Sequence, residues 1–152
     1  MRRKDKEIAD RAQIDAVIRR ARICRLGMAW DNRPYIVPLC FGYDGSALYF
    51  HSAREGRKID MLRKNGAVCF EIDIEARVRA ADEACKWGMG YRSVMGTGRA
   101  TLLYDPAAKR TALDLIMAQY GSDAPVYAEA ALNRTLIIKV QIEAISGKTS
   151  GP

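Results

Sequence analysis

Two strand-like segments separated by a tight turn restrict most strongly how this chain can fold. Residues 35–43 are rich in aromatic and β-branched side chains, and residues 47–51 are also strand-like. Only Asp44, Gly45 and Ser46 separate them, which is a hairpin signal. A parallel pair would need a crossover of a dozen or more residues. The two segments therefore predict an antiparallel sheet and argue against a doubly wound parallel one.

Hydrophobic periodicity predicts the remaining elements. Strand-like character marks residues 23–30, 67–74, 91–104 and 135–145. Helices are expected over residues 5–22, from Arg57 to Asn65, after the cap-like pair Asp105 and Pro106, and over residues 126–132. Gly96 and Gly98 interrupt a long strand and predict a bulge. Six strands with helices between them predict an α+β fold that is mainly β.

Length and composition limit the classes of protein further. A chain of 152 residues suits one domain covering residues 1–152, and 49% apolar residues favour a globular protein. No apolar run approaches the length of a membrane span, and the charged start does not resemble a secretion signal, so a cytoplasmic protein is expected. The four cysteines are far apart and His51 is the only histidine, so no metal site is expected.

A short segment around the start of the second helix is the best candidate for chemistry. The net charge of +7 favours an anionic partner, such as a phosphorylated cofactor, an acidic metabolite or nucleic acid. His51 and Ser52 end a strand, and Arg57 and Lys58 open a helix. A phosphate is bound by such hydroxyls, cations and helix N–H groups. The alternative is structural, because Ser52 and Glu55 also match a capping box.

Three segments carry a resemblance to a known family. Residues 49–65 resemble the strand-then-helix signature of the pyridoxamine 5′-phosphate oxidase-like superfamily, and within it that of the nitroimidazole-resistance (Nim) flavoproteins. Residues 33–43 and 91–100 point the same way. The matching pattern runs from about residue 4 to Lys148, which is nearly the whole chain.

The resemblance implies a six-stranded antiparallel split β-barrel that forms a homodimer with FMN between its subunits. In that family the pair matching Arg57 and Lys58 grips the FMN phosphate, and the flavin ring lies along the second strand. The implied cofactor contacts are Val37, Pro38, Leu39, Cys40, His51, Ser52, Arg57, Lys58 and Ser93. Arg92 is a further candidate, since a cation near the ring would favour the anionic reduced flavin. His51 is the candidate proton donor, because its ordinary pKa lies near neutrality.

The implied function is that of an FMN-dependent oxidoreductase reducing a small acceptor such as a nitroaromatic, a nitroimidazole or a quinone. Pyridoxamine oxidation itself is not expected, because Ile36 and Cys40 stand where those oxidases carry basic residues. A non-catalytic carrier or sensor of flavin, haem or deazaflavin is the alternative. Nucleic-acid binding is not expected, because the basic residues form no recognition motif.

Overall fold

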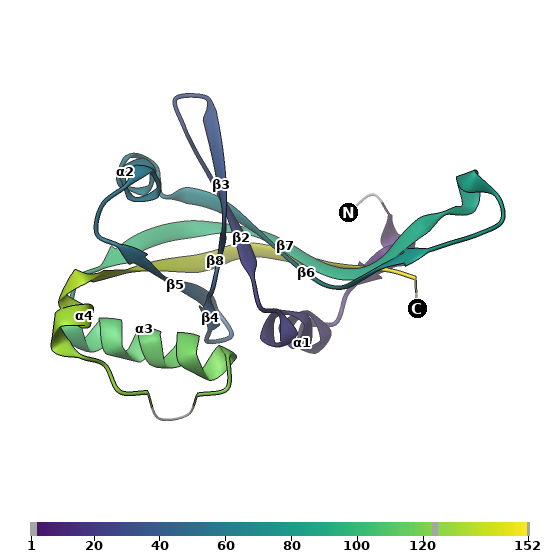
Figure 1. Ribbon diagram of the computed structural model, residues 1–152. Coiled ribbons are helices and arrows are strands. Elements are labelled where there is room, and N and C mark those ends of the chain that lie inside the picture. Colours follow the sequence, from purple (N-terminus) through teal and green to yellow (C-terminus); the bar gives the residue numbers. More distant parts are fainter. Residues whose placement is uncertain (1–2, 123–124, 152) are drawn as a thin grey trace.

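One antiparallel sheet organises the molecule. The computed structural model describes residues 3–122 and 125–151 (Figure 1), and within them eight strands pair in the order β3-β2-β6-β7-β8-β5-β4, with β1 beside β8. The strands are β1 (Glu7–Ile8), β2 (Cys24–Trp30), β3 (Arg33–Leu39), β4 (Gly42–Tyr43), β5 (Ala47–Ala53), β6 (Ala67–Arg79), β7 (Gly88–Leu103) and β8 (Thr135–Ser150). The fold is mainly β, and its antiparallel sheet agrees with the predicted split barrel.

Four α-helices accompany the sheet in the described ranges. They are α1 (Arg11–Arg20), α2 (Arg57–Lys64), α3 (Pro106–Gln119) and α4 (Glu129–Arg134), with single 3-10 turns at Lys4–Lys6 and Ala84–Lys86. Asp105 caps α3 as predicted, because its side chain accepts a hydrogen bond from the N–H of Ala108 at 2.8 Å. None of the helices in the described part of the chain is long and apolar enough to span a membrane.

The predicted number of six strands was wrong, for two reasons. The segment over residues 35–43 divides into β3 and β4, because fully buried Phe41 turns into the core between them. The helix expected over residues 5–22 begins only at Arg11, since Asp10 caps it through the N–H of Ala12. The residues before that cap form β1, which pairs with the end of β8.

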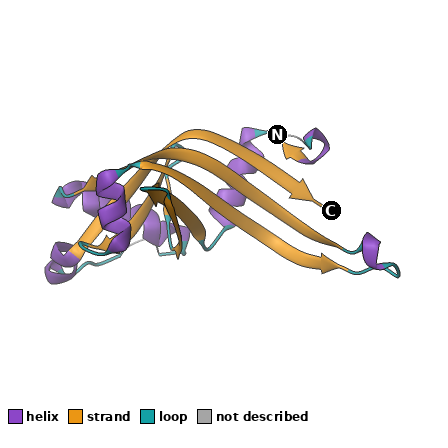
Figure 2. Ribbon diagram, turned by 90° about the horizontal axis from the view of Figure 1, so that it is seen from above, coloured by secondary structure: helices purple, strands orange, loops and turns teal. Residues whose placement is uncertain are grey.

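The β6–β7 hairpin is longer than expected. Both strands extend beyond the rest of the sheet and end in a projecting tip (Figure 2). Exposed side chains occupy nearly all of residues 75–89, so burial leaves no alternating pattern there to predict a strand. The register of β7 against β8 shifts between Thr97 and Gly98, which confirms the predicted irregularity.

Apolar side chains cover one face of the sheet. Fully buried Ile72 and Val94 face the main core, and α1 lies over them with Val17 and Ile18. A second cluster lies between the sheet and α3, and it contains Ala47, Tyr49, Ala112, Ile116 and Ile137.

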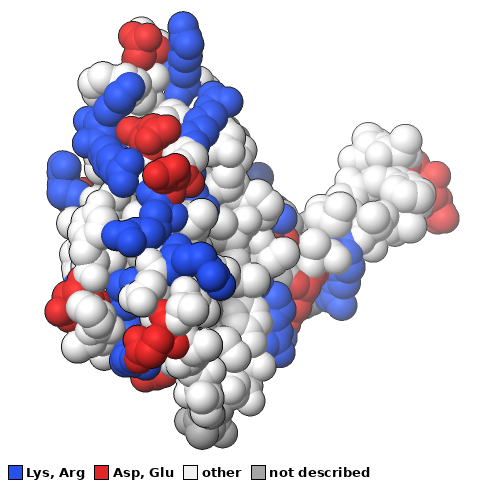
Figure 3. Space-filling model, turned by 60° about the vertical axis from the view of Figure 1, so that its left-hand side comes forward, with Lys and Arg blue, Asp and Glu red and all other residues white. Residues whose placement is uncertain are grey.

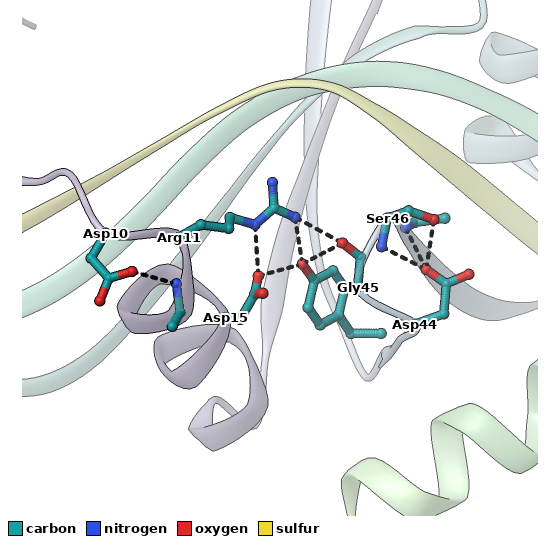
Figure 4. A network of polar contacts seen from close by, with 9 residues as sticks. Asp10, Arg11, Asp15, Asp44, Gly45 and Ser46 are labelled. Atoms are coloured by element: carbon teal, nitrogen blue, oxygen red, sulfur yellow. Dashed lines mark hydrogen bonds and ion pairs between the residues drawn. The ribbon is translucent and has the colours of Figure 1, made fainter.

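A polar network holds the start of α1 against the turn between β4 and β5 (Figure 4). The hydroxyl of Tyr43 donates to the carboxylate of Asp15 at 2.6 Å, and Arg11 donates to the carbonyl of Gly45 at 2.8 Å. Asp44 accepts hydrogen bonds from the N–H groups of Ser46 and Ala47, both at 2.7 Å. The predicted hairpin turn is therefore present, and it also positions the helix that covers the core.

Candidate functional site

The N-terminus of α2 has no side-chain cap. Its N-cap is Gly56, whose φ of 120° is readily adopted only by glycine, and no side chain accepts from the first turn. The capping box considered for Ser52 and Glu55 is wrong, because Ser52 lies inside β5 and the helix begins only at Arg57. The N–H groups of this first turn are therefore available to an anion.

Two cations lie at this helix terminus. The guanidinium of Arg57 sits over the ring of Tyr35, 4.4 Å from its centroid. Lys58 is half-buried, and burial lowers the pKa of its ammonium group. Within residues 3–122 and 125–151, neither side chain forms an ion pair with a carboxylate. An anion bound here would compensate both charges and the helix dipole.

His51 and Ser52 lie on opposite faces at the end of β5. Ser52 pairs with Leu136, which belongs to the main core, whereas His51 pairs with Ile137, which belongs to the cluster under α3. Residues paired across an antiparallel ladder share a face of the sheet. Ser52 therefore shares the face on which α2 packs, and His51 faces the side of α3.

Strand β3 begins beside the α2 terminus and runs away from it along the edge of the sheet. Tyr35, Val37 and Leu39 pack against the core, whereas Pro38 and Cys40 are exposed. The contact between Arg57 and Tyr35 joins the helix terminus to the start of this strand. A ligand with an anionic end at α2 could thus extend along β3.

The free edge of β3 presents backbone groups rather than polar side chains. Proline has no N–H, so Pro34 and Pro38 fit at positions whose backbone polar groups point away from β2. Because a strand repeats every two residues, the backbone N–H and C=O groups of Ile36 and Cys40 also point away from β2. The edge therefore offers carbonyl acceptors at the prolines and N–H donors at Ile36 and Cys40, which suits a planar ligand with alternating donors and acceptors.

The predicted contacts on β7 lie away from α2 and on different faces. Ser93 pairs with Asp73, about 17 Å along β6 from Val68, which pairs with β2 near α2. Ser93 is buried on the face opposite Val94 and the core. Arg92 shares the core-side face and pairs with Glu75 at 3.5 Å. Within a single chain, therefore, these two residues do not lie at the α2 terminus.

An apolar groove lies on the face of the sheet opposite the main core, which we call the open face. The sequence analysis did not predict this groove. It consists of two adjoining cavities of 690 and 410 Å³ that share Gly27, Ile36, Cys69 and Thr97. Ile36 is 62% exposed and Met95, in the smaller cavity, is 49% exposed. Cys69 lies between buried Val68 and Phe70, so the sequence places apolar side chains on both faces of β6. This was the signal from which the groove could have been predicted.

Charge on the end of the molecule that carries α2 and α3 is mixed. Figure 3 turns this end forward and shows Lys and Arg side chains interspersed with Asp and Glu. The arrangement is not the continuous basic stripe typical of nucleic-acid binding.

Comparison with known proteins identifies a matching family and several similar proteins. Residues 10–149 match the family model described as pyridoxamine 5′-phosphate oxidase. An uncharacterized protein of Rhizobium meliloti (strain 1021) is 33% identical over 92 residues, which cover 60% of this chain and only 54% of that relative's length. The crystal structure of a proposed 5-nitroimidazole antibiotic resistance protein from Bacteroides thetaiotaomicron VPI-5482 is 34% identical, with a TM-score of 0.83, over 93% of this chain and 85% of that one.

A more distant structural relative has the same fold. The FAD and heme binding protein from Mycobacterium smegmatis has a TM-score of 0.85 at 20% identity, over 97% of this chain and 74% of that one. At this identity the likeness concerns the fold alone.

Proposed function

The chain belongs to the pyridoxamine 5′-phosphate oxidase family, and from that premise we propose that it binds FMN as a homodimer and reduces a small organic acceptor. The acceptor classes that we propose are nitroaromatics, nitroimidazoles and quinones. A bound flavin would supply the electron-transfer chemistry, while the protein holds it and controls access to it.

The uncapped N-terminus of α2 is the observation that carries this proposal. It combines free first-turn N–H groups with Arg57 and Lys58, which have no carboxylate partner among the described residues. Ser52 lies on the same side of the sheet and adds a hydroxyl. These groups match the needs of a phosphate monoester.

The rest of the flavin is assigned to β3. From a phosphate at α2, the ring would lie along Val37, Pro38, Leu39 and Cys40, where the strand edge presents backbone donors and acceptors. Since β3 is an edge strand, the ring needs a second wall. The apolar groove beside Ile36 supports a partner subunit there, because exposed apolar surface of this kind is typical of interfaces.

The homodimer also gives a role to Ser93 but not to Arg92. Ser93 lies on the open face, so the partner's copy of this residue could reach the flavin from across the interface. Arg92 faces the other way, towards Glu75, so the arrangement favours Ser93 as the contact from β7. His51 faces α3, which favours a structural over a catalytic role for its imidazole.

Replacing Arg57 and Lys58 together with alanine tests the phosphate site. Each charged hydrogen bond contributes about 1.5–3 kcal/mol, so FMN affinity should fall by at least about 100-fold. The measurement is the flavin absorbance of the purified protein near 450 nm, with mass spectrometry of the released ligand and titration of FMN into the stripped protein. The same mass spectrum distinguishes FMN from FAD, and a Soret band would reveal haem.

The matched control removes two cations from the other end of the same helix. Arg63 pairs with Asp60 and Lys64 lies over Trp30, so the R63A/K64A variant has the same change in net charge without touching the proposed site. It should keep its flavin, as should His51→Ala. Equal flavin content in R57A/K58A and R63A/K64A would refute the phosphate assignment.

Catalysis is separated from a carrier role by a second experiment. The flavin is reduced anaerobically with dithionite and mixed with a nitroimidazole or a quinone. If the protein is a reductase, its reduced flavin should be reoxidised at a rate that rises in proportion to acceptor concentration. The acceptor should gain as many electrons as the flavin loses. A reduced flavin that persists with every acceptor would favour a carrier or sensor.

A further inference from the structure

Helix α2 lies alongside the β2–β3 hairpin (Figure 1), and each end of the helix places a cation over an aromatic ring of that hairpin. Arg57, at the first helical position, lies over Tyr35 with its guanidinium carbon 4.4 Å from the ring centroid. Lys64, at the last position, lies over Trp30 with its ammonium nitrogen 5.9 Å from the centroid. Only the first pair adjoins the proposed phosphate site, so the second pair serves as an internal reference for it.

The register of the sheet places the Tyr35 ring on the face against which α2 packs. Tyr35 pairs with Met28, which is buried in the main core, and paired residues share a face of the sheet. The ring is half-buried and packs against that core, which restricts its motion. The hydroxyl of Tyr35 has no hydrogen-bond partner in the part of the chain that the structure describes. The aromatic face is therefore what Tyr35 presents to Arg57.

The guanidinium of Arg57 keeps its hydrogen-bond donors while it lies over the ring. A cation is attracted to the face of an aromatic ring through its charge, without a hydrogen-bond acceptor. Among the described residues, no side chain or carbonyl accepts a hydrogen bond from this guanidinium. A planar fork of N–H donors binds a phosphate through paired hydrogen bonds. The ring thus restrains Arg57 without using the donors that a phosphate needs.

The packing of α2 does not depend on this ring. Ile59 and Leu62 are 0% and 6% exposed, and they anchor the helix in the main core. The contact with Tyr35 therefore adds little to the placement of the helix, but it determines where the long side chain of Arg57 lies. An arginine that a ligand immobilises loses conformational entropy, and a side chain that is already held loses less.

We propose that Tyr35 is a positioning residue of the phosphate site, whose ring holds the Arg57 guanidinium in place before the phosphate binds. This inference rests on the proposed function, since it takes Arg57 to bind the phosphate of a flavin. Ordering one long side chain in advance should change FMN affinity by roughly three- to tenfold. The affinity should depend on the ring of Tyr35, and only through Arg57.

Titration of FMN into the flavin-stripped protein, followed by flavin fluorescence, tests the proposal. Tyr35→Leu removes the ring and should raise the dissociation constant for FMN by roughly three- to tenfold. Tyr35→Phe keeps the ring and should stay within about twofold of the parent protein. Tyr35→Ile is a second variant without the ring, and its β-branched side chain suits a strand. It should lose as much affinity as Tyr35→Leu, and it replaces that variant if Tyr35→Leu does not fold.

Two controls show whether the effect passes through Arg57. In the Arg57→Ala background, Tyr35→Leu should change affinity by less than about twofold, because the two residues act as one unit. Trp30→Leu removes the ring from the other cation pair of the same helix and should also change FMN affinity by less than about twofold. The proposal is overturned by unchanged affinity in the variants without the ring, by an equal loss in Tyr35→Phe, or by an undiminished loss in the Arg57→Ala background.

The same titrations separate this proposal from the proposed function. If Arg57→Ala binds FMN like the parent protein, the assignment of Arg57 to the phosphate is wrong, and the role of Tyr35 is refuted with it. If Arg57→Ala weakens binding whereas Tyr35→Leu does not, the phosphate site stands and only the role of Tyr35 is refuted.

Discussion

The two faces of the central sheet are built from alternate residues of the same strands and have different surroundings. On β6 and β7, Ile72 and Val94 are fully buried beneath α1. On the other face, exposed Cys69 and Met95 line an apolar groove that no described segment of the chain covers. The difference indicates that the covered face stabilises the folded chain, whereas the apolar groove on the open face is accessible to a binding partner.

The open face also explains why the proposed site is incomplete in one protomer. In our proposal, the uncapped α2 terminus would bind the phosphate and the free edge of β3 would form one side of the ring site. Ser93 lies on the open face but far along the sheet. A partner subunit on this face would supply the missing wall, and three experiments test the contrast between the faces.

The largest effect is expected from a charge placed in the groove. Met95→Asp should weaken the proposed dimer by more than roughly 10,000-fold, because an uncompensated buried charge costs about 3–5 kcal/mol and a twofold interface contains two copies. Light scattering after size-exclusion chromatography measures the change. Met89→Asp is the control, since Met89 is similarly exposed, at 45% against 49%, but lies outside the groove. A Met95→Asp protein that remains dimeric would place the interface elsewhere.

The covered face should respond through the stability of the protomer. Ile72→Ala should lower the free energy of unfolding by about 2–5 kcal/mol, because it opens a cavity in a fully packed core. Urea unfolding at one fixed protein concentration measures this loss. Val78→Ala, on the same strand but 61% exposed, should change stability by no more than about 0.5 kcal/mol. Equal losses in the two variants would contradict the assignment of the core to this face.

A smaller, pH-dependent effect is expected at the turn that positions α1. Burial alone would raise the pKa of Asp44, but hydrogen bonds from Ser46, Tyr49 and Ala47 outweigh it and hold the pKa below its usual value. The stability that Asp44 contributes is therefore present above pH 4 and is lost as the pH falls through the lowered pKa. Asp44→Asn should cost about 1 kcal/mol at pH 7 and progressively less in acid.

Thermal unfolding between pH 7 and pH 2.5 measures that difference. Asp82→Asn on the exposed hairpin is the control and should follow the parent protein at each pH. A loss of stability in Asp44→Asn that is independent of pH would show that the negative charge of Asp44 does not stabilise this turn.

Local signals were the reliable part of the sequence analysis. Asp105 and Pro106 predicted the start of α3, and Asp44 to Ser46 predicted the turn between β4 and β5. The helix start predicted at Arg57 is also a local signal, and α2 begins there. The strand count failed where local patterns were ambiguous, as at Phe41 and in β1, whose pairing partner is some 140 residues away.

The sequence alone determined which residues alternate, which residue caps a helix and where cations adjoin a helix start, because these depend on neighbours a few positions apart. Only the tertiary structure decided that Ser52 and His51 lie on different faces, that Arg57 reaches Tyr35, and that strands β2, β3, β6, β7 and β8 form one groove. These features depend on strand order and register, which are set by packing between distant segments.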